Sequence, residues 1–433
     1  MWDHTNSRSW QTPSRSCALS VHYLYGFSLI LCLLLFSTLR ITTPSMDSPL
    51  KPSLIDDLIP NIIEHLAASS DASHVAPLAR ISSAWLNPVR KVLYSSPKLL
   101  TYHSCLALSQ TLIQSPALGK RIHTLSLHPV AHPCSKGPSC ECCTLQVFAL
   151  SLAPLFRLDN LNQLILGGDC AVHAEWYLRS FLYPKNITSL KVVGMQWYWS
   201  FDSSRPVSAS LRWSDSLTSR FSNLKHLEIR NLELYVCEVR SFKPKPPHLE
   251  SLILEGVNVT GGQLSDVAPN AWNNLQELSL SFTDHSSAYD INSILSSASK
   301  SIQVLRVFLT GDTEGSQLAR PLLNEDILAS CTSLHSLQLA LPFAVSFVSR
   351  LGDRLTQLKI LKVFSNYEIG IEDWASLMYS GAFPSLRELH LPVGHELRRI
   401  ADWQLPNLHS GTIRSVCANR GVDLHFAYLL SKS

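Results

Sequence analysis

Charged residues are scarce in this chain. Asp, Glu, Lys and Arg together make up 16% of the 433 residues, and the formal net charge is only +3. The basic residues are spread along the chain, so the sequence lacks the clustered positive face that nucleic-acid binding requires. We therefore expect no nucleic-acid partner.

Catalytic fingerprints are also missing. The sequence has no phosphate-binding loop, no dinucleotide glycine motif, no nucleophile elbow and no His-Glu-x-x-His. His395-Glu396 comes nearest to the last of these, but it lacks the second histidine. We expect no catalytic residues and no cofactor, and a metal-dependent enzyme is the weakest of the functional alternatives.

The eleven cysteines do not form a disulfide framework. Their number is odd and most are scattered singly along a long chain. This usage is typical of reduced thiols in the cytoplasm or nucleus. One loop gathers thiols and imidazoles, which are zinc ligands, but the spacing matches no standard paired motif, so we assign no metal site. The loop is then a flexible connection, and a zinc site is the alternative. The loop residues are His128, His132, Cys134, Cys140, Cys142 and Cys143.

A six-residue phrase recurs along the chain: an aliphatic residue, two others, Leu, one other, and Leu, Ile or Val. Its last two apolar residues are two apart, which places them on one side of a short strand. One unit cannot bury that side alone, but stacked units can, so the repeat predicts a solenoid. The copies begin at Ile122, Leu161, Ile187, Leu224, Leu249, Leu275, Ile302, Leu334, Leu358 and Leu386.

The segments between the phrases have helical spacing. A strand, a helix and a parallel strand form a right-handed crossover, so the sequence predicts an α/β solenoid with parallel strands inside and helices outside. The apolar sets are Ile291, Ile294, Leu295 and Ala298; Leu322, Leu323, Ile327 and Leu328; Phe343, Phe347, Val348 and Leu351; and Trp374, Leu377 and Met378.

These phrases resemble those of leucine-rich repeats. After the third apolar position the family usually places Asn or Cys, whereas this chain has Leu232, Val257 and Thr283, with Asn366 in one unit. We therefore expect residues 101–433 to form an irregular leucine-rich-repeat arc with variable loops.

The amino-terminal region contains a long apolar stretch. Residues 16–39 carry no Asp, Glu, Lys or Arg and are dense in Leu, Phe and Ile, and this is long enough for a membrane helix. A cleaved signal peptide fits less well because Asp3 precedes the stretch. The other alternative is that translation starts at Met46. Residues 1–45 are thus a possible membrane anchor or a segment outside the main product.

Residues 47–100 form a different kind of unit, with the apolar spacing of three short amphipathic helices. We expect Asp57 to cap the first helix, with Pro60 in its first turn. We expect the second to run into Trp85 and the third to stop at Pro97. The apolar sets are Leu54, Leu58, Ile62, Ile63 and Leu66; Val75, Leu78 and Ile81; and Val89, Val92, Leu93 and Tyr94.

This unit resembles an F-box domain of the variant common in fungal proteins. The opening Leu-Pro of the family stands here as Leu54-Ile55, whereas its Val-Ser-x-x-Trp core survives as Ile81–Trp85. The resemblance implies docking on the Skp-type adaptor of a cullin–RING ubiquitin ligase. The alternative is that the same residues only form the core of a helical cap. The adaptor-binding candidates are Leu54, Leu58, Ile62, Ile81, Trp85 and Leu93.

An F-box followed by leucine-rich repeats is a familiar pairing, and it implies a substrate-recognition subunit of an SCF-type cullin–RING ubiquitin ligase. The repeats would bind a target protein destined for ubiquitin-dependent degradation. The alternative is a repeat scaffold for protein–protein interaction that has no role in ubiquitination. Either function fits the cytoplasm or nucleus, with membrane anchoring only if residues 16–39 are retained.

Side chains between the buried strand positions face the concave side of such a repeat. Arg306, Phe308, Lys362 and Phe364 occupy equal strand positions two repeats apart, so we expect one patch of aromatic anchors and charges. Alternatively, carboxy-terminal loops cover this face, or the target binds the loop edge. The target-binding candidates are Arg230, Arg306, Phe308, Lys362, Phe364 and His390.

A second aromatic group stands between two repeats. It consists of Gln196–Phe201, which contains two tryptophans, and of Trp213 further on. Aromatic side chains anchor protein interfaces, but they also pack long loops onto a core. Both interpretations stay open from the sequence.

Overall fold

A computed structural model describes most of the chain after residue 52. The chain divides into two compact units, Met1–Ile59 and Pro60–Ser433. The apolar stretch 16–39 and the start at Met46 lie outside the described residues. No helix in the part that is described is long and apolar enough to cross a membrane. The described ranges are 53–69, 72–130, 151–194, 209–237, 248–268, 271–282, 290–309, 323–341, 343–364, 369–392 and 406–427.

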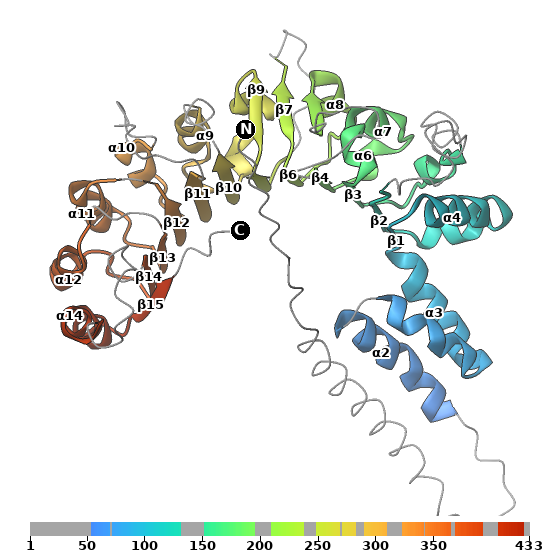
Figure 1. Cartoon of the computed structure of the whole chain (residues 1–433), viewed down its shortest axis with the longest axis horizontal. Coiled ribbons are helices and arrows are strands. Elements are labelled where there is room, and N and C mark those ends of the chain that lie inside the picture. Colours follow the sequence, from blue (N-terminus) through green and yellow to red (C-terminus); the bar gives the residue numbers. More distant parts are fainter. Residues whose placement is uncertain are drawn as a thin grey trace, which may run out of the picture. The chain divides into compact units, whose positions relative to one another are not determined.

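The larger unit is built on a parallel sheet of 12 strands (Figure 1). Neighbours in the sheet follow chain order, so each strand pairs with the next repeat. The strands are β1 (Lys98–Leu99), β2 (Thr124–Leu127), β3 (Gln163–Gly167), β4 (Ser189–Val193), β6 (His226–Arg230), β8 (Ser251–Glu255), β10 (Glu277–Phe282), β11 (Val304–Leu309), β12 (Ser336–Ala340), β13 (Ile360–Val363), β14 (Glu388–Pro392) and β15 (Asp423–Ala427).

All ten copies of the repeated phrase form strands of this sheet. The central leucine of each copy is the direct register partner of the central leucine in the next, from Leu125 on β2 to Leu389 on β14. A one-residue shift in any strand would turn its leucines to the opposite face. The apolar pattern therefore fixes the register, and the predicted parallel α/β solenoid arrangement is confirmed.

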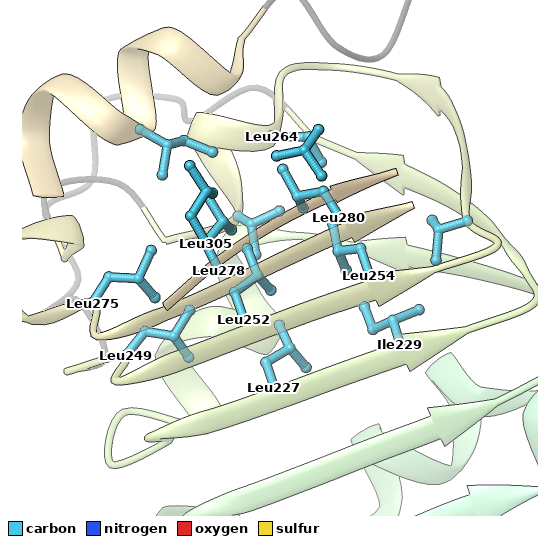
Figure 2. Close-up of a cluster of buried hydrophobic side chains, with 14 of the residues drawn as sticks. Leu227, Ile229, Leu249, Leu252, Leu254, Leu264, Leu275, Leu278, Leu280 and Leu305 are labelled. Carbon is cyan, nitrogen blue, oxygen red and sulfur yellow. The ribbon is translucent and has the colours of Figure 1, made fainter. Parts of the chain in front are cut away.

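The core lies on the face of the sheet that these leucines occupy. Figure 2 shows side chains of four neighbouring repeats gathered there, with the entry residues Leu249 and Leu275 beside the strand residues Leu252, Leu278 and Leu305. These five side chains have no exposed fraction above 1%. Burying a leucine contributes roughly 1.5–3 kcal/mol. Most of the stability therefore comes from contacts between neighbouring repeats.

Helices cover the core face (Figure 1). Their buried residues include most of the predicted sets, such as Ile291, Ile294 and Leu295 on α9 and Trp374 on α12. Ile327, Phe343 and Phe347 are only partly buried, and Leu323 and Phe343 lie just before their helices. Leu322 lies outside the described residues. The α-helices are α4 (Tyr102–Gln114), α6 (Asp169–Val172), α7 (Ala174–Ser180), α8 (Asp215–Arg220), α9 (Ile291–Ala298), α10 (Glu325–Ala329), α11 (Val345–Arg354), α12 (Ile371–Tyr379) and α14 (Pro406–Asn419).

Several connections contain short 3₁₀ segments, some beside an α-helix and, between β8 and β10, without one in the described residues. They are η2 (Pro116–Arg121), η4 (Leu155–Arg157), η5 (Pro184–Asn186), η6 (Leu264–Val267) and η7 (Trp272–Asn274). The repeats thus differ in their helical side while their strands keep one register, which agrees with the expected irregularity.

A second parallel sheet was not predicted. It consists of β5 (Ser210–Trp213), β7 (Glu233–Val236) and β9 (Asn258–Gly261), in that order. Leu232 and Val257, which replace the usual turn Asn, are buried where the chain leaves the first sheet for the second.

The chain turns sharply between the two sheets. Asn231 has φ +52° and Gly256 has φ +61°. A Cβ on Gly256 would lie 2.5 Å from Asn231 Oδ1, so a larger residue there would be strained and would displace the Asn231 side chain.

The amino-terminal helices differ from the prediction in their boundaries. Helix α2 (Ser53–Ser69) begins upstream of Asp57, so Asp57 is not its cap and Pro60 lies inside it. The apolar spacing already starts at Leu54, which explains the earlier start.

The next two helices also end at other residues than expected. The second is the 3₁₀ helix η1 (Ala72–Arg80), and it ends before Trp85. Trp85 lies on α3 (Ser83–Ser95) together with the third predicted set. Pro77 within η1 removes one backbone donor, which disfavours a regular α-helix there. The predicted boundary near residue 100 stays a prediction.

Candidate binding surface

The candidate surface is the face of the 12-stranded sheet opposite the buried leucines, here called the open face. It is formed by the alternate residues of each strand, because successive side chains point to opposite sides of a sheet. The helices that connect the repeats, from α4 to α14, lie on the other side of the sheet (Figure 1). On β11, for example, Leu305 and Val307 are buried, whereas Val304, Arg306 and Phe308 are partly exposed.

Except for Lys98 on β1, the described lysines and arginines on the strands of the open face each pair with a carboxylate of their own or a neighbouring strand. These contacts are half-buried and neutralise the face strand by strand, and each contributes on the order of 0.2–1 kcal/mol. The pairs are Lys191–Glu228 at 2.8 Å, Arg230–Glu228, Arg230–Glu255 at 2.8 Å, Arg306–Glu277, and Lys362–Glu388 at 3.2 Å.

Two aromatic rings meet on the open face across an intervening strand. Phe308 lies on β11 and Phe364 lies just after β13, with β12 between the two strands. Their ring centroids are 5.8 Å apart and the ring planes are inclined by 40°. The register partner of Phe308 on β12 is Ala340. Its small side chain leaves the space in which rings two repeats apart can touch.

The predicted patch of four residues is therefore brought together in part. Phe308 and Phe364 are in contact, and Arg306 and Lys362 are separated only by their common register neighbour Gln338. The two cations point in different directions, because Arg306 pairs with Glu277 on β10 and Lys362 with Glu388 on β14. The polar residue between Arg306 and Lys362 on this patch is therefore the neutral Gln338, and neither cation is free.

Arg230 belongs to a separate cluster. It lies on β6, and β8 and β10 stand between β6 and β11. It contacts Glu228 and Glu255, and Glu228 also pairs with Lys191. The structure therefore does not bring Arg230 into the aromatic patch.

His390 lies at the other side of the patch, on β14. Its Nε2 contacts Glu388 Oε1, and its ring stacks on His425 of β15 with centroids 4.5 Å apart. The hydrogen bond with His390, together with Lys362, holds the pKa of Glu388 below its usual range. Glu388 therefore carries its charge at neutral pH.

Sequence reasoning missed His425 and its neighbour Asp423. Strand β15 repeats the acid-Leu-His order of β14, but the first position of the phrase is Gly421, not an aliphatic residue. Gly421 has φ +68° and stands just after the end of helix α14. An aliphatic residue adopts this left-handed conformation less readily than glycine. The acid-x-His repetition was the signal that could have found this strand.

The adaptor-binding candidates differ in exposure. Leu58 is 51% exposed and Ile81 is 59% exposed. Ile81 is therefore not part of a helical core, which corrects that alternative for this residue. Ile62, Trp85 and Leu93 are partly buried. The side chain of Leu54 lies outside the described residues. Docking on an adaptor stays a prediction for all six.

Two further sequence candidates are described only in part. Trp213 is 2% exposed and its Nε1 donates a hydrogen bond to Val267 O at 2.9 Å, so it packs the second sheet onto the core. Residues 196–201 lie outside the described part. In the thiol-rich loop, His128 is described, and burial is the main cause that lowers its pKa. The remaining loop residues, from His132 to Cys143, lie outside the description.

Comparison with known proteins gives little resemblance. No family model matches the chain, and the search of curated proteins gives no match. Among solved structures, the chain is similar to an internalin from Listeria monocytogenes, with a TM-score of 0.31 and 16% identity. That match covers 64% of this chain and 65% of the internalin, which is less than two thirds of the internalin's length. The fold assignment rests on the sheet topology and register described above.

Proposed function

We propose that this chain is the substrate-recognition subunit of an SCF-type cullin–RING ubiquitin ligase. The helical segment 47–100 binds a Skp-type adaptor, and the open face binds the target protein. The observation that carries the proposal is the exposure of large aliphatic side chains in the F-box-like segment. Leu58 and Ile81 are each more than half exposed. Leaving such side chains in water forgoes the roughly 1.5–3 kcal/mol that burial of each would contribute, which favours a partner surface.

The open face supports a protein partner for the repeats. Its cations other than Lys98 are neutralised by neighbouring carboxylates, so it presents no row of free positive charge for phosphates. Its Phe308–Phe364 pair offers apolar ring surface surrounded by polar groups, the arrangement of protein interface centres and rims.

Adaptor binding tests the proposal directly. The full chain is expected to bind a purified Skp-type adaptor in surface plasmon resonance, and the double variant L58A/I81A is expected to bind at least tenfold more weakly, because each truncated interface anchor costs about 1 kcal/mol or more. The matched control is I113A, because Ile113 is 66% exposed but lies on α4, outside the segment.

Failure of the wild-type chain to bind the adaptor would sink the ligase assignment. If L58A/I81A binds as tightly as I113A does, the adaptor contacts a different surface. A chain that binds no adaptor but still binds a protein through the open face is the repeat scaffold without a ubiquitin role.

The target-binding half has its own test. Proteins cross-linked to the wild-type chain in cells are compared with those cross-linked to F308S/F364S, and each candidate is then tested as a purified protein. The variant is expected to lose the target while keeping adaptor affinity. Y379S is the matched control, because Tyr379 is an 84% exposed aromatic on helix α12. Equal binding of the purified target to all three chains would exclude the open face as the binding site.

A further inference from the structure

Two neighbouring strands at the carboxy-terminal side of the open face carry the same acid-x-His order. On β14 these residues are Glu388 and His390, and on β15 they are Asp423 and His425. The strands are parallel and in register, so Glu388 stands beside Asp423 and His390 beside His425. Leu389 between the first pair is buried. The two carboxylates and two imidazoles therefore share the open face.

Three of these side chains place ligand atoms close together. One oxygen of Glu388 and one ring nitrogen each of His390 and His425 lie within 4.8 Å of one another. The His rings are nearly parallel, with an interplanar angle of 22°. Two ligands of one zinc ion stand about 3–3.5 Å apart, given metal–ligand distances of about 2.0–2.2 Å. Metal binding therefore requires rotation of these side chains, and the exposed His425 has solvent on one side of its ring.

We propose that Glu388, His390 and His425 form a binding site for a divalent transition-metal ion, with Asp423 as an available fourth ligand. Imidazole nitrogens with one carboxylate suit Zn²⁺, Ni²⁺ or Cu²⁺, whereas Mg²⁺ and Ca²⁺ prefer oxygen ligands alone. This site is separate from the thiol-rich loop and does not depend on the proposed ligase function.

Lys362 affects the metal affinity of this site. Its Nζ lies 3.2 Å from Glu388 Oε1, the same oxygen that His390 contacts. The ion pair orients the carboxylate, and Oε2 of Glu388 is the oxygen available to a metal ion. The lysine charge also repels a dication. At about 5 Å in water this repulsion is of order 1 kcal/mol, so removing the charge strengthens binding roughly threefold to tenfold.

Isothermal titration calorimetry tests the proposal. Ni²⁺ is titrated into the full chain from which metal has first been removed with EDTA. Ni²⁺ is chosen because it favours imidazole over thiolate more than Zn²⁺ does. Wild type is expected to bind one more Ni²⁺ ion than H425Q, and H390Q is expected to lose the same ion. H226Q is the matched control, since His226 is an exposed histidine on β6 of the same face, and it is expected to bind like wild type.

K362M separates a metal site from a structural role of these histidines. It is expected to bind Ni²⁺ roughly threefold to tenfold more tightly, whereas a merely structural pair would give no change. Because His425 is exposed, H425Q decides the question even if H390Q fails to fold. Equal stoichiometry and affinity in wild type, H425Q and H226Q would overturn the proposal, and so would unchanged or weaker binding by K362M.

Discussion

Single residues set how closely neighbouring strands approach on the open face. Ala340 lets the rings of Phe308 and Phe364 meet, and Gly167 lets the ring of His128 lie over the next strand. A Cβ on Gly167 would come within 2.0 Å of His128 Nδ1. Burial, followed by the charges of Lys98 and Lys191, lowers the pKa of His128. The folded chain therefore prefers the neutral imidazole.

His128 should make stability depend on pH. The unfolded chain takes up a proton on this residue near pH 6.5, whereas the folded chain does so only at lower pH. The unfolded state thus binds more protons as the pH falls through this window, and the free energy of unfolding decreases. Urea unfolding at pH 7.5 and 5.5 should show a smaller acid loss for H128Q than for wild type. Equal losses in the two chains would show that the His128 ring titrates freely in the fold.

The elements follow from the alternation of apolar residues and from local capping. Each strand is four to six residues in most repeats, too short to be stable alone. Helix α10 is also too short to be stable as an isolated helix. Asn324 caps its amino-terminal end. The Oδ1 of Asn324 accepts hydrogen bonds from Asp326 N at 2.9 Å and Ile327 N at 3.3 Å.

Removal of this cap should destabilise the helical side of one repeat. N324A leaves two backbone donors of α10 without their side-chain partner, and it should lower the free energy of unfolding by about 1 kcal/mol. N324D keeps a side-chain acceptor and should remain close to wild type. Chemical denaturation of the three chains gives the measurement. A loss in N324D as large as that in N324A would mean that the backbone donors do not need this acceptor.

At the scale of the whole molecule, the repeats of the larger unit form a stack in which each repeat contacts mainly its neighbours. The carboxy-terminal repeat is fastened to the one before it by Arg420. The guanidinium of Arg420 donates to Met378 O at 2.8 Å and to Phe383 O at 2.9 Å, next to the end of helix α12. Helix α14 ends there too, with Gly421 N bonded to Ala418 O and Val422 N to Cys417 O, in a Schellman arrangement.

Loss of the Arg420 contacts should loosen one end of the stack and leave the rest intact. R420M keeps much of the side-chain volume but leaves two carbonyls without a charged donor, which costs about 1.5–3 kcal/mol locally. Hydrogen–deuterium exchange should become faster in α12, α14 and β15 and stay unchanged in β3 and β4, because coupling passes only between neighbours. Uniformly faster exchange through the whole sheet would indicate a single cooperative unit instead.

The sequence by itself determined the parallel repeat architecture, the ten strands and the side chains that face the open side. It could do so because apolar residues two apart commit a strand to one face, and the same spacing recurs in every copy. It also placed Phe308 and Phe364 in one patch, since equal positions in stacked repeats share a face.

Tertiary structure alone decided which of those side chains meet. The pairing of Arg306 and Lys362 with opposite neighbours depends on which strands flank them, and the contact of the two rings depends on Ala340 in between. The stacking of His390 on His425 needs β15, whose first phrase position is a glycine with φ +68° that ends a helix. Such contacts join residues far apart in the chain, so they follow from strand order and register and not from local spacing.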